Sequence, residues 1–351
     1  MKLKNILSVL CFLFIAAACS MEDDVLDGNS SKLVPEEGSA YVSAVINLGG
    51  TQTKATTGGA SSTPEEYTAD AIASCALFLL DSNDKVVGVH TETYTNSNAT
   101  SQEIKFLTKV NVAEKAVAVV NYNQSNSENI LACSNFLALK KYMEHNADYR
   151  IKVGEGTIDW TDVVGSTSTT GDLGTAKTTI MVQSRTAIVE LVKFAVKFEG
   201  AGDHPTVKLK EVSLSNLKQD GGLYDEGSSF SNTAFSFNNN LPADPDSYGT
   251  NGYFRKNVYP NTDAEKPITL KLKFTVDGKD SSEYERSYII NRPTSDGFVN
   301  NSGHMYVQPG CWYQLSATVT VNTGKIDCAI ECHVLDWIYQ SINAGDIYPN
   351  K

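Results

Sequence analysis

Short runs of alternating apolar and polar residues are the feature that most limits how this chain can fold. The clearest are TLKLKFTV at 269–276 and YQLSATVTV at 313–321, and both have the two-residue period of a strand with one buried face. Turn signals such as Asp277-Gly278 and Pro309-Gly310 separate the runs. Many short strands with few helices predict a mainly β protein built of β-sandwiches.

Length and local breaks in the pattern suggest how the chain is divided. About 300 residues beyond the N-terminal segment are too many for one sandwich core, so we predict two domains in tandem, at 55–180 and 181–351. The apolar run at 73–80 predicts a strand buried on both faces. The Gly-, Ser- and Thr-rich stretch at 154–174 predicts loops.

One short helix is predicted in the first domain. Ser125 and Glu128 have the spacing of a capping box. The residues that follow place Phe136 and Leu137 on one side of a helical pattern that ends near His145.

The stretch 39–60 joins two segments of opposite character. Five apolar residues occupy every second position of its first half and would share one face of a strand; they are Ala40, Val42, Ala44, Ile46 and Leu48. The second half consists of Gly, Thr, Gln and Ser with one basic residue, Lys54, and this composition is typical of an exposed loop open to proteolysis. We therefore interpret the strand as removable: it fills a groove until the loop is cut, and a strand from another copy then replaces it.

The N-terminus resembles the signal of a bacterial lipoprotein. Lys2 and Lys4 precede an apolar core of about 10 residues, which is too short to span a bilayer as a helix. Small residues then precede Cys19. The resemblance implies a signal peptide at 1–18 and acylation of Cys19, so that the precursor is held to a membrane by lipid. An ordinary secretory signal that contains a cysteine is the alternative.

The acidic residues that follow Cys19 resemble an export signal for outer-membrane lipoproteins. The whole chain is acidic, with 41 Asp and Glu against 29 Lys and Arg and a net charge of -12. This balance argues against nucleic acid as a partner, because phosphate backbones are bound by basic surfaces.

The number of cysteines argues against a full disulfide framework. After removal of Cys11 with the signal and acylation of Cys19, five remain, and an odd number leaves at least one unpaired. Cys328 and Cys332 share a face of the run KIDCAIECHV with apolar residues, so we interpret them as small core residues. A metal pair at these two positions is the alternative, but no second pair at ligand spacing accompanies it.

No catalytic motif stands out in the sequence. The five histidines are scattered, and the chain contains no HExxH, GxSxG, Walker loop or EF-hand pattern. We therefore expect a protein that is not an enzyme, with no cofactor and no metal site.

Taken in order, the parts of the chain resemble the fimbrillins, subunits of the type V pili of Bacteroidales-type anaerobic Gram-negative bacteria. The resemblance rests on an ordered set of segments that covers nearly the whole chain; these are AAAC, AYVSAVINL, GGTQTKATTGG, CALFLLDSNDKVV, AVAVVNYN, MVQSRTAIVELVKF, YQLSATVTV and CHVLDWIYQ.

The resemblance implies two transthyretin-like β-sandwich domains and a protein that matures at the cell surface. An Arg/Lys-specific surface protease would cut between Lys54 and Ala55, so that 19–54 is a propeptide whose strand completes the first domain before cleavage. Partners would be further pilin subunits, either copies of this chain or shaft, tip and anchor paralogues, in a fimbrium that supports adhesion. The alternative is that Lys54 is an ordinary loop lysine of an uncut subunit.

The resemblance also places a donor strand at the C-terminus. The candidate runs from Leu335 to Tyr348, with side chains suited to fill a groove at Leu335, Trp337, Tyr339 and Ile342. Alternatively, Trp337 closes the core of its own subunit. A different class of function, a glycan-binding surface lipoprotein of β-sandwich type, would share the signal and the fold and would use Tyr and Trp as sugar platforms.

Overall fold

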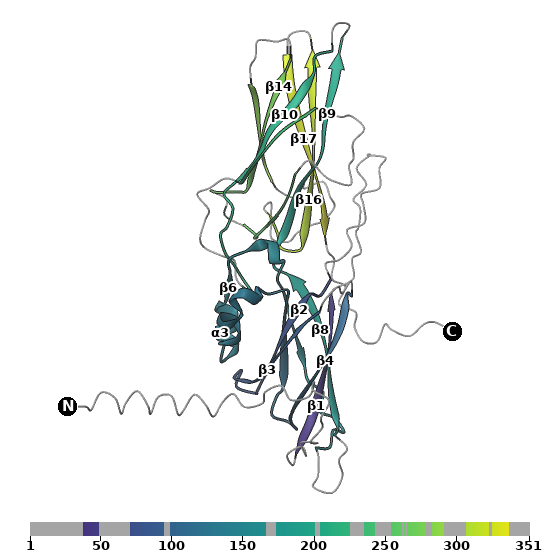
Figure 1. Ribbon diagram of the computed structural model, residues 1–351, viewed down its shortest axis with the longest axis vertical. Helices are drawn as coiled ribbons and strands as arrows, with labels where there is room; N and C mark the ends of the chain where they lie inside the picture. The colour runs from purple at the N-terminus through teal and green to yellow at the C-terminus, as the bar shows by residue number, and fades with distance from the viewer. Residues whose placement is uncertain are drawn as a thin grey trace, which may run out of the picture.

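The computed structural model describes residues 38–48, 71–94, 99–165, 173–200, 204–224, 235–242, 254–261, 263, 265–277, 283–290, 307–322 and 325–336. Figure 1 shows an elongated molecule, with β1, β2, β4 and β8 near one end of the long axis and β9, β10, β14 and β17 near the other. Strands dominate the described residues, so the predicted mainly β fold is confirmed.

Seven strands form the first sheet, in the order β3-β2-β5-β7-β8-β1-β4. Their bounds are β1 Ser39–Leu48, β2 Ser74–Leu80, β3 Val86–Thr93, β4 Ser101–Lys109, β5 Lys115–Val120, β7 Lys152–Thr157 and β8 Thr175–Ser184. Strand β8 is long enough to pair with β1 along most of its length and with β7 at its end, where Lys152 lies opposite Ser184. The sheet bends at this junction, so β2 and β5 lie across one core from β1, β4 and β8.

Strand β2 separates two hydrophobic cores. Cys75, Leu77 and Leu79 belong to the core shared with β1, whereas Ala76 and Phe78 belong to a core on the opposite face. All seven residues of β2 are buried, as the continuous apolar run predicts.

The single helix predicted after Ser125 is wrong, because the chain forms short pieces instead. They are a 3₁₀ turn at Gln124–Asn126, α2 at Ser127–Leu131, α3 at Phe136–Lys141 and a second 3₁₀ turn at Ala147–Tyr149. Asn135 has an extended backbone, and its side chain accepts a hydrogen bond from Ala138 N, so it starts a new helix. Within α3, Phe136 is buried but Leu137 is 59% exposed, which corrects the predicted apolar side.

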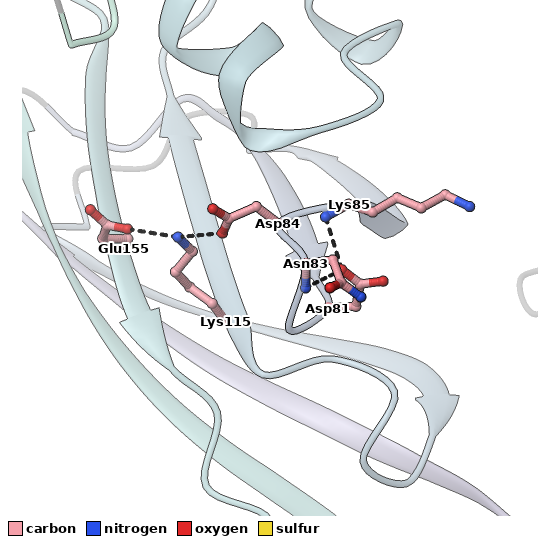
Figure 2. A network of polar contacts seen from close by, with 6 residues as sticks. All are labelled: Asp81, Asn83, Asp84, Lys85, Lys115 and Glu155. Carbon is pink, nitrogen blue, oxygen red and sulfur yellow. Dashed lines mark hydrogen bonds and ion pairs between the residues drawn. The ribbon is translucent and has the colours of Figure 1, made fainter.

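The turn at 81–85 fixes the start of β3, as Figure 2 shows. Asp81 Oδ1 accepts hydrogen bonds from the backbone N of Asn83 and of Lys85, both at 2.9 Å. Asp84 pairs with Lys115 of β5 at 3.1 Å, and the same ammonium lies 3.4 Å from Glu155 of β7. The turn is thereby tied to two neighbouring strands.

Part of the predicted loop at 154–174 is strand β7. Gly154 and Gly156 lie opposite Ala118 and Ala116 of β5. A Cβ at Gly154 would collide with the carbonyl oxygen of Met181 in β8, so glycine lets the two strands approach. The prediction failed because glycines selected for close packing look like turn residues in sequence.

Two four-stranded sheets enclose the third core. One has the order β12-β10-β14-β15 and the other β13-β9-β16-β17. Their bounds are β9 Ala187–Glu199, β10 Val207–Ser215, β12 Phe235–Pro242, β13 Phe254–Val258, β14 Thr269–Val276, β15 Glu283–Ile289, β16 Cys311–Asn322 and β17 Lys325–Asp336. Inward residues of both sheets, such as Phe194 and Phe274, form one cluster, which makes this a sandwich.

Several polar contacts join the first sheet and its helices to this sandwich. Strand β6 (Met143–Glu144) pairs with β11 (Gly221–Gly222), and the Arg185 guanidinium donates to the carbonyl oxygen of Tyr224 at 2.9 Å. Asp148 accepts hydrogen bonds from Lys256 at 2.9 Å and from Asn257 at 3.2 Å. Partial burial alone would raise the pKa of Asp148, but the two hydrogen bonds and the ammonium charge outweigh it, so this pKa is lowered.

The predicted border at residues 180 and 181 falls inside β8. By its pairing, this strand belongs to the first sheet through Ser184, and β9 of the four-stranded sheet β13-β9-β16-β17 begins at Ala187.

Candidate assembly site around strand β1

Strand β1 lies between two other strands and is paired on both edges. On one side Ser39 to Asn47 run antiparallel to β4, and on the other Tyr41 to Leu48 run parallel to β8. Its backbone therefore contributes to two ladders of hydrogen bonds. If β1 left, it would expose the facing edges of both β4 and β8.

One face of β1 is buried, as the alternation predicts. Ala40, Val42, Ala44 and Ile46 are 0% exposed, and Leu48 is 7% exposed. The last four belong to the core that also contains residues of β2, β5 and β8. The predicted position of this strand inside the first sheet is confirmed, whereas its removal stays a prediction.

Polar contacts hold the opposite face and the ends of β1. Ser43 is buried, and its Oγ donates to Glu103 Oε1 of β4 at 2.6 Å. The backbone N of Leu48 donates to the carbonyl oxygen of Thr100 at 2.8 Å. At the other end Gly38, with φ of 83°, accepts from the N of Val110 at 3.0 Å.

Most of the other predicted site residues lie outside the described residues. These are Cys19, Lys54, Ala55, Trp337, Tyr339 and Ile342. Leu335 lies within β17, opposite Trp312 of β16, so the first residue of the candidate donor segment belongs to the ladder of its own subunit.

The cysteines of the described part are buried thiols. All five are buried, and none forms a disulfide; they are Cys75, Cys133, Cys311, Cys328 and Cys332. Burial raises the pKa of Cys328 to about 11, while the charge of Arg286 lowers this pKa and that of Asp327 raises it. Burial also raises the pKa of Cys75. The interpretation of Cys328 and Cys332 as core residues is confirmed by their place in the core between the two four-stranded sheets.

Two other features, a metal-binding cluster and a membrane-spanning helix, are absent from the described part of the chain. No group of three or more His, Cys, Asp and Glu side chains is arranged to hold a metal ion there. Within the same residues, no helix has the length and apolar character needed to cross a bilayer.

Sequence reasoning missed one contact that bears on this site. Phe106 of β4 packs its ring against Gly88 of β3, and a Cβ at Gly88 would lie 2.8 Å from Phe106 Cε1. An isolated glycine inside a strand pattern, here in VVGVH, indicates a close approach by another part of the chain. That signal was available, but it does not name the partner.

No protein-family model matches the sequence, and a search of curated proteins finds no significant match. Solved structures do match over most of the chain. A candidate cell adhesion protein from Parabacteroides distasonis has a TM-score of 0.57 at 15% identity, over 87% of this chain and 100% of that one. A fimbrilin from Porphyromonas gingivalis has a TM-score of 0.53 at 13% identity, over 86% of this chain and 98% of that one. The chain has a fimbrillin-like fold.

A third structure agrees with this assignment. A candidate cell adhesion protein from Bacteroides eggerthii has a TM-score of 0.56 at 13% identity, over 86% of this chain and 97% of that one. The fimbrillin-like fold extends through both ends of the elongated molecule, because each match covers at least 86% of the chain.

Proposed function

We propose that this fimbrillin-like protein is a structural subunit of a fimbrium, which polymerises by strand exchange after proteolysis and supports adhesion. The observation that carries the proposal is strand β1, which is buried between β4 and β8 and is followed closely by a basic residue. Lys54 is the only basic residue between Leu48 and Pro64. A cut there would separate β1 from the body of the chain.

The loss of β1 would leave a slot that favours refilling. The backbone groups of β4 and β8 that face β1 would lose their partners, which is costly unless another strand pairs with them. Val42, Ile46 and Leu48 would each contribute about 2 kcal/mol by burial, on the order of 6 kcal/mol before the cost of ordering the strand. An extended segment with the same alternation would restore both the ladder hydrogen bonds and the burial of apolar side chains.

The proposal includes a route to the surface and a maturation step. Lipid on Cys19 would hold the precursor at the outer membrane, and an Arg/Lys-specific surface protease would cut between Lys54 and Ala55. The mature chain would then begin at Ala55 and consist of two domains, and we place their border at the short link between β8 and β9 instead of at residues 180 and 181. Release of the propeptide 19–54 would free the subunit from its anchor.

The donor segment is proposed to come from the C-terminus of a second subunit. It would start after β17 and present Trp337, Tyr339 and Ile342, while Leu335 stays in the ladder of its own sheet. An exchange from tail to slot is head-to-tail, and such contacts form open filaments when the rotation between subunits does not close a ring.

Limited digestion of the purified precursor tests the proposal. Trypsin should cut the wild type first after Lys54, and ladders that resist SDS should follow. Lys54→Gln, which keeps the length and polarity of the side chain, should stay uncut in this loop and monomeric. A cut wild type that stays monomeric would overturn the proposal, and retention on a polysaccharide gel would then favour the glycan-binding alternative.

A further inference from the structure

Strand β4 depends on β1 more than any other strand does. It is the outermost strand next to β1, and among the described strands it pairs with β1 alone. Strand β8, in contrast, also pairs with β7. Departure of β1 would therefore remove every ladder partner that β4 has in the described structure.

The ends of β4 are held by other contacts. Before the strand begins, the carbonyl oxygen of Ala99 accepts a hydrogen bond from Ile72 N at 3.1 Å. After it ends, Glu114 N donates to the carbonyl oxygen of Leu80 at 2.8 Å. Neither contact reaches the middle of the strand, where an incoming strand would have to pair.

Phe106 holds the middle of β4 through a contact with β3. It lies across from Val42 of β1, so it faces the core, where it packs with the buried cluster. Its ring packs against the backbone of Gly88 in β3, and the centroids of the Phe106 and His90 rings are 5.6 Å apart. Because β3 and β4 are the two outer strands of the seven, this contact closes the open side of the first sheet.

Strand β3, which Phe106 contacts, is held in place by contacts that do not involve β1. Strand β3 pairs with β2, and its start is tied to β5 and β7 through the contacts of Asp84 and Lys115 (Figure 2). The N of Val86 also donates to the carbonyl oxygen of Ser134, at 3.0 Å. Gly88 therefore keeps its place when β1 is absent.

We propose that Phe106 is a positioning residue that keeps the empty slot open at the width of one strand. This inference rests on the proposed strand exchange. Because β1 is antiparallel to β4 and parallel to β8, β4 and β8 run in opposite directions and could pair directly. A movement of β4 by one strand spacing, about 4.8 Å, would bring them together and fill the slot. The contact with Gly88 opposes that movement, so the slot stays available to a strand from another subunit.

Capture of a peptide by the cut protein tests this role. The full chain would carry a site for a sequence-specific protease in place of residues near Lys54, so that the test does not depend on the natural cut. The probe is a labelled synthetic peptide with the sequence of residues 39–48, added in excess during cleavage. We expect Phe106→Ala to capture it about tenfold more slowly than the wild type, or slower still. Phe106→Leu, which keeps apolar contact, should recover most of the rate.

Leu107→Ala is the matched control, because Leu107 is the next residue on the other face of β4. It should capture the peptide at the wild-type rate. Hydrogen exchange before cleavage should show β4 protected in all variants. After cleavage without peptide, β4 should lose protection in the wild type and keep it in Phe106→Ala, where β4 pairs with β8.

The outcomes distinguish failure of the proposed role of Phe106 from failure of the proposed function. Equal capture by the wild type and Phe106→Ala would overturn the role of Phe106 and leave strand exchange intact. Equal slowing by Phe106→Ala and Leu107→Ala would also overturn it, because the effect would then be general destabilisation. If none of the proteins captured the peptide, the wild type included, both strand exchange and the role of Phe106 would be rejected.

Discussion

Shortening one inward side chain of β1 should loosen this strand much more than shortening its outward neighbour. Ile46 is 0% exposed and lies opposite Gln102 of β4 and Ile180 of β8. Replacement by Ala removes buried carbons from a closely packed core and leaves a cavity. Such changes cost roughly 2 to 5 kcal/mol, so we expect about 3 kcal/mol for Ile46→Ala in the uncut protein.

Hydrogen exchange measures this loss where it occurs. If β1 opens by leaving its slot as a unit, about 3 kcal/mol raises the open population roughly 100-fold, and the amides of β1 exchange faster by that factor. The amides of β4 should follow, since β4 has no other described ladder partner. Amides of β16 lie in a different sheet, β13-β9-β16-β17, and should not change.

Val45→Ala is the control, because Val45 is adjacent and only half-buried on the other face. It should cost less than about 1 kcal/mol. Equal effects of the two substitutions would refute the reasoning, since they would show that the inward face does not anchor the strand. Faster exchange in β1 with no change in β4 would refute the claimed dependence of β4.

Three further predictions concern other parts of the molecule. Asn135→Ala should lower the free energy of unfolding by about 1 kcal/mol in urea denaturation, and no change would contradict its role as a helix cap. The stability from the Asp148–Lys256 pair should be present above about pH 4 and be lost as the pH falls through the lowered pKa of Asp148. The difference in Tm between wild type and Asp148→Asn should thus shrink on acidification, and a constant difference would argue against the pair. After removal of β1, iodoacetamide should label Cys75 faster, whereas Cys328, in the other core, should stay protected; mass spectrometry distinguishes them, and parallel labelling would indicate global unfolding.

Local patterns predicted the strands, because a few consecutive residues are enough to show whether apolar side chains alternate or form a continuous run. The alternation at Ala40 to Leu48 and the continuous run at 73–80 predict which side chains are buried, and the structure agrees except at Ala73, which precedes β2 and is exposed. The helix after Ser125 was predicted wrongly for a related reason. Its break depends on Asn135, whose cap geometry competes with continuation of a helix that the pattern alone allows.

The neighbours of a strand are set by contacts between distant residues, and sequence patterns do not state them. Nothing local to β1 indicates that it lies between β4 and β8, or that β4 has no second partner in the described part. The contact of Phe106 with Gly88 joins residues of two outer strands in the same way. The slot could thus be predicted from the sequence, whereas the strands that form its walls required the structure.

The most direct test of the central claim asks which molecule fills the slot in the polymer. Copies with normal and heavy nitrogen would be mixed before cleavage, polymerised and cross-linked between β4 or β8 and whatever segment lies between them. We expect cross-linked peptide pairs of mixed isotope composition, with residues from beyond β17 of one copy in the slot of another. Pairs from a single copy only, or residues 39–48 still in the slot, would contradict the account.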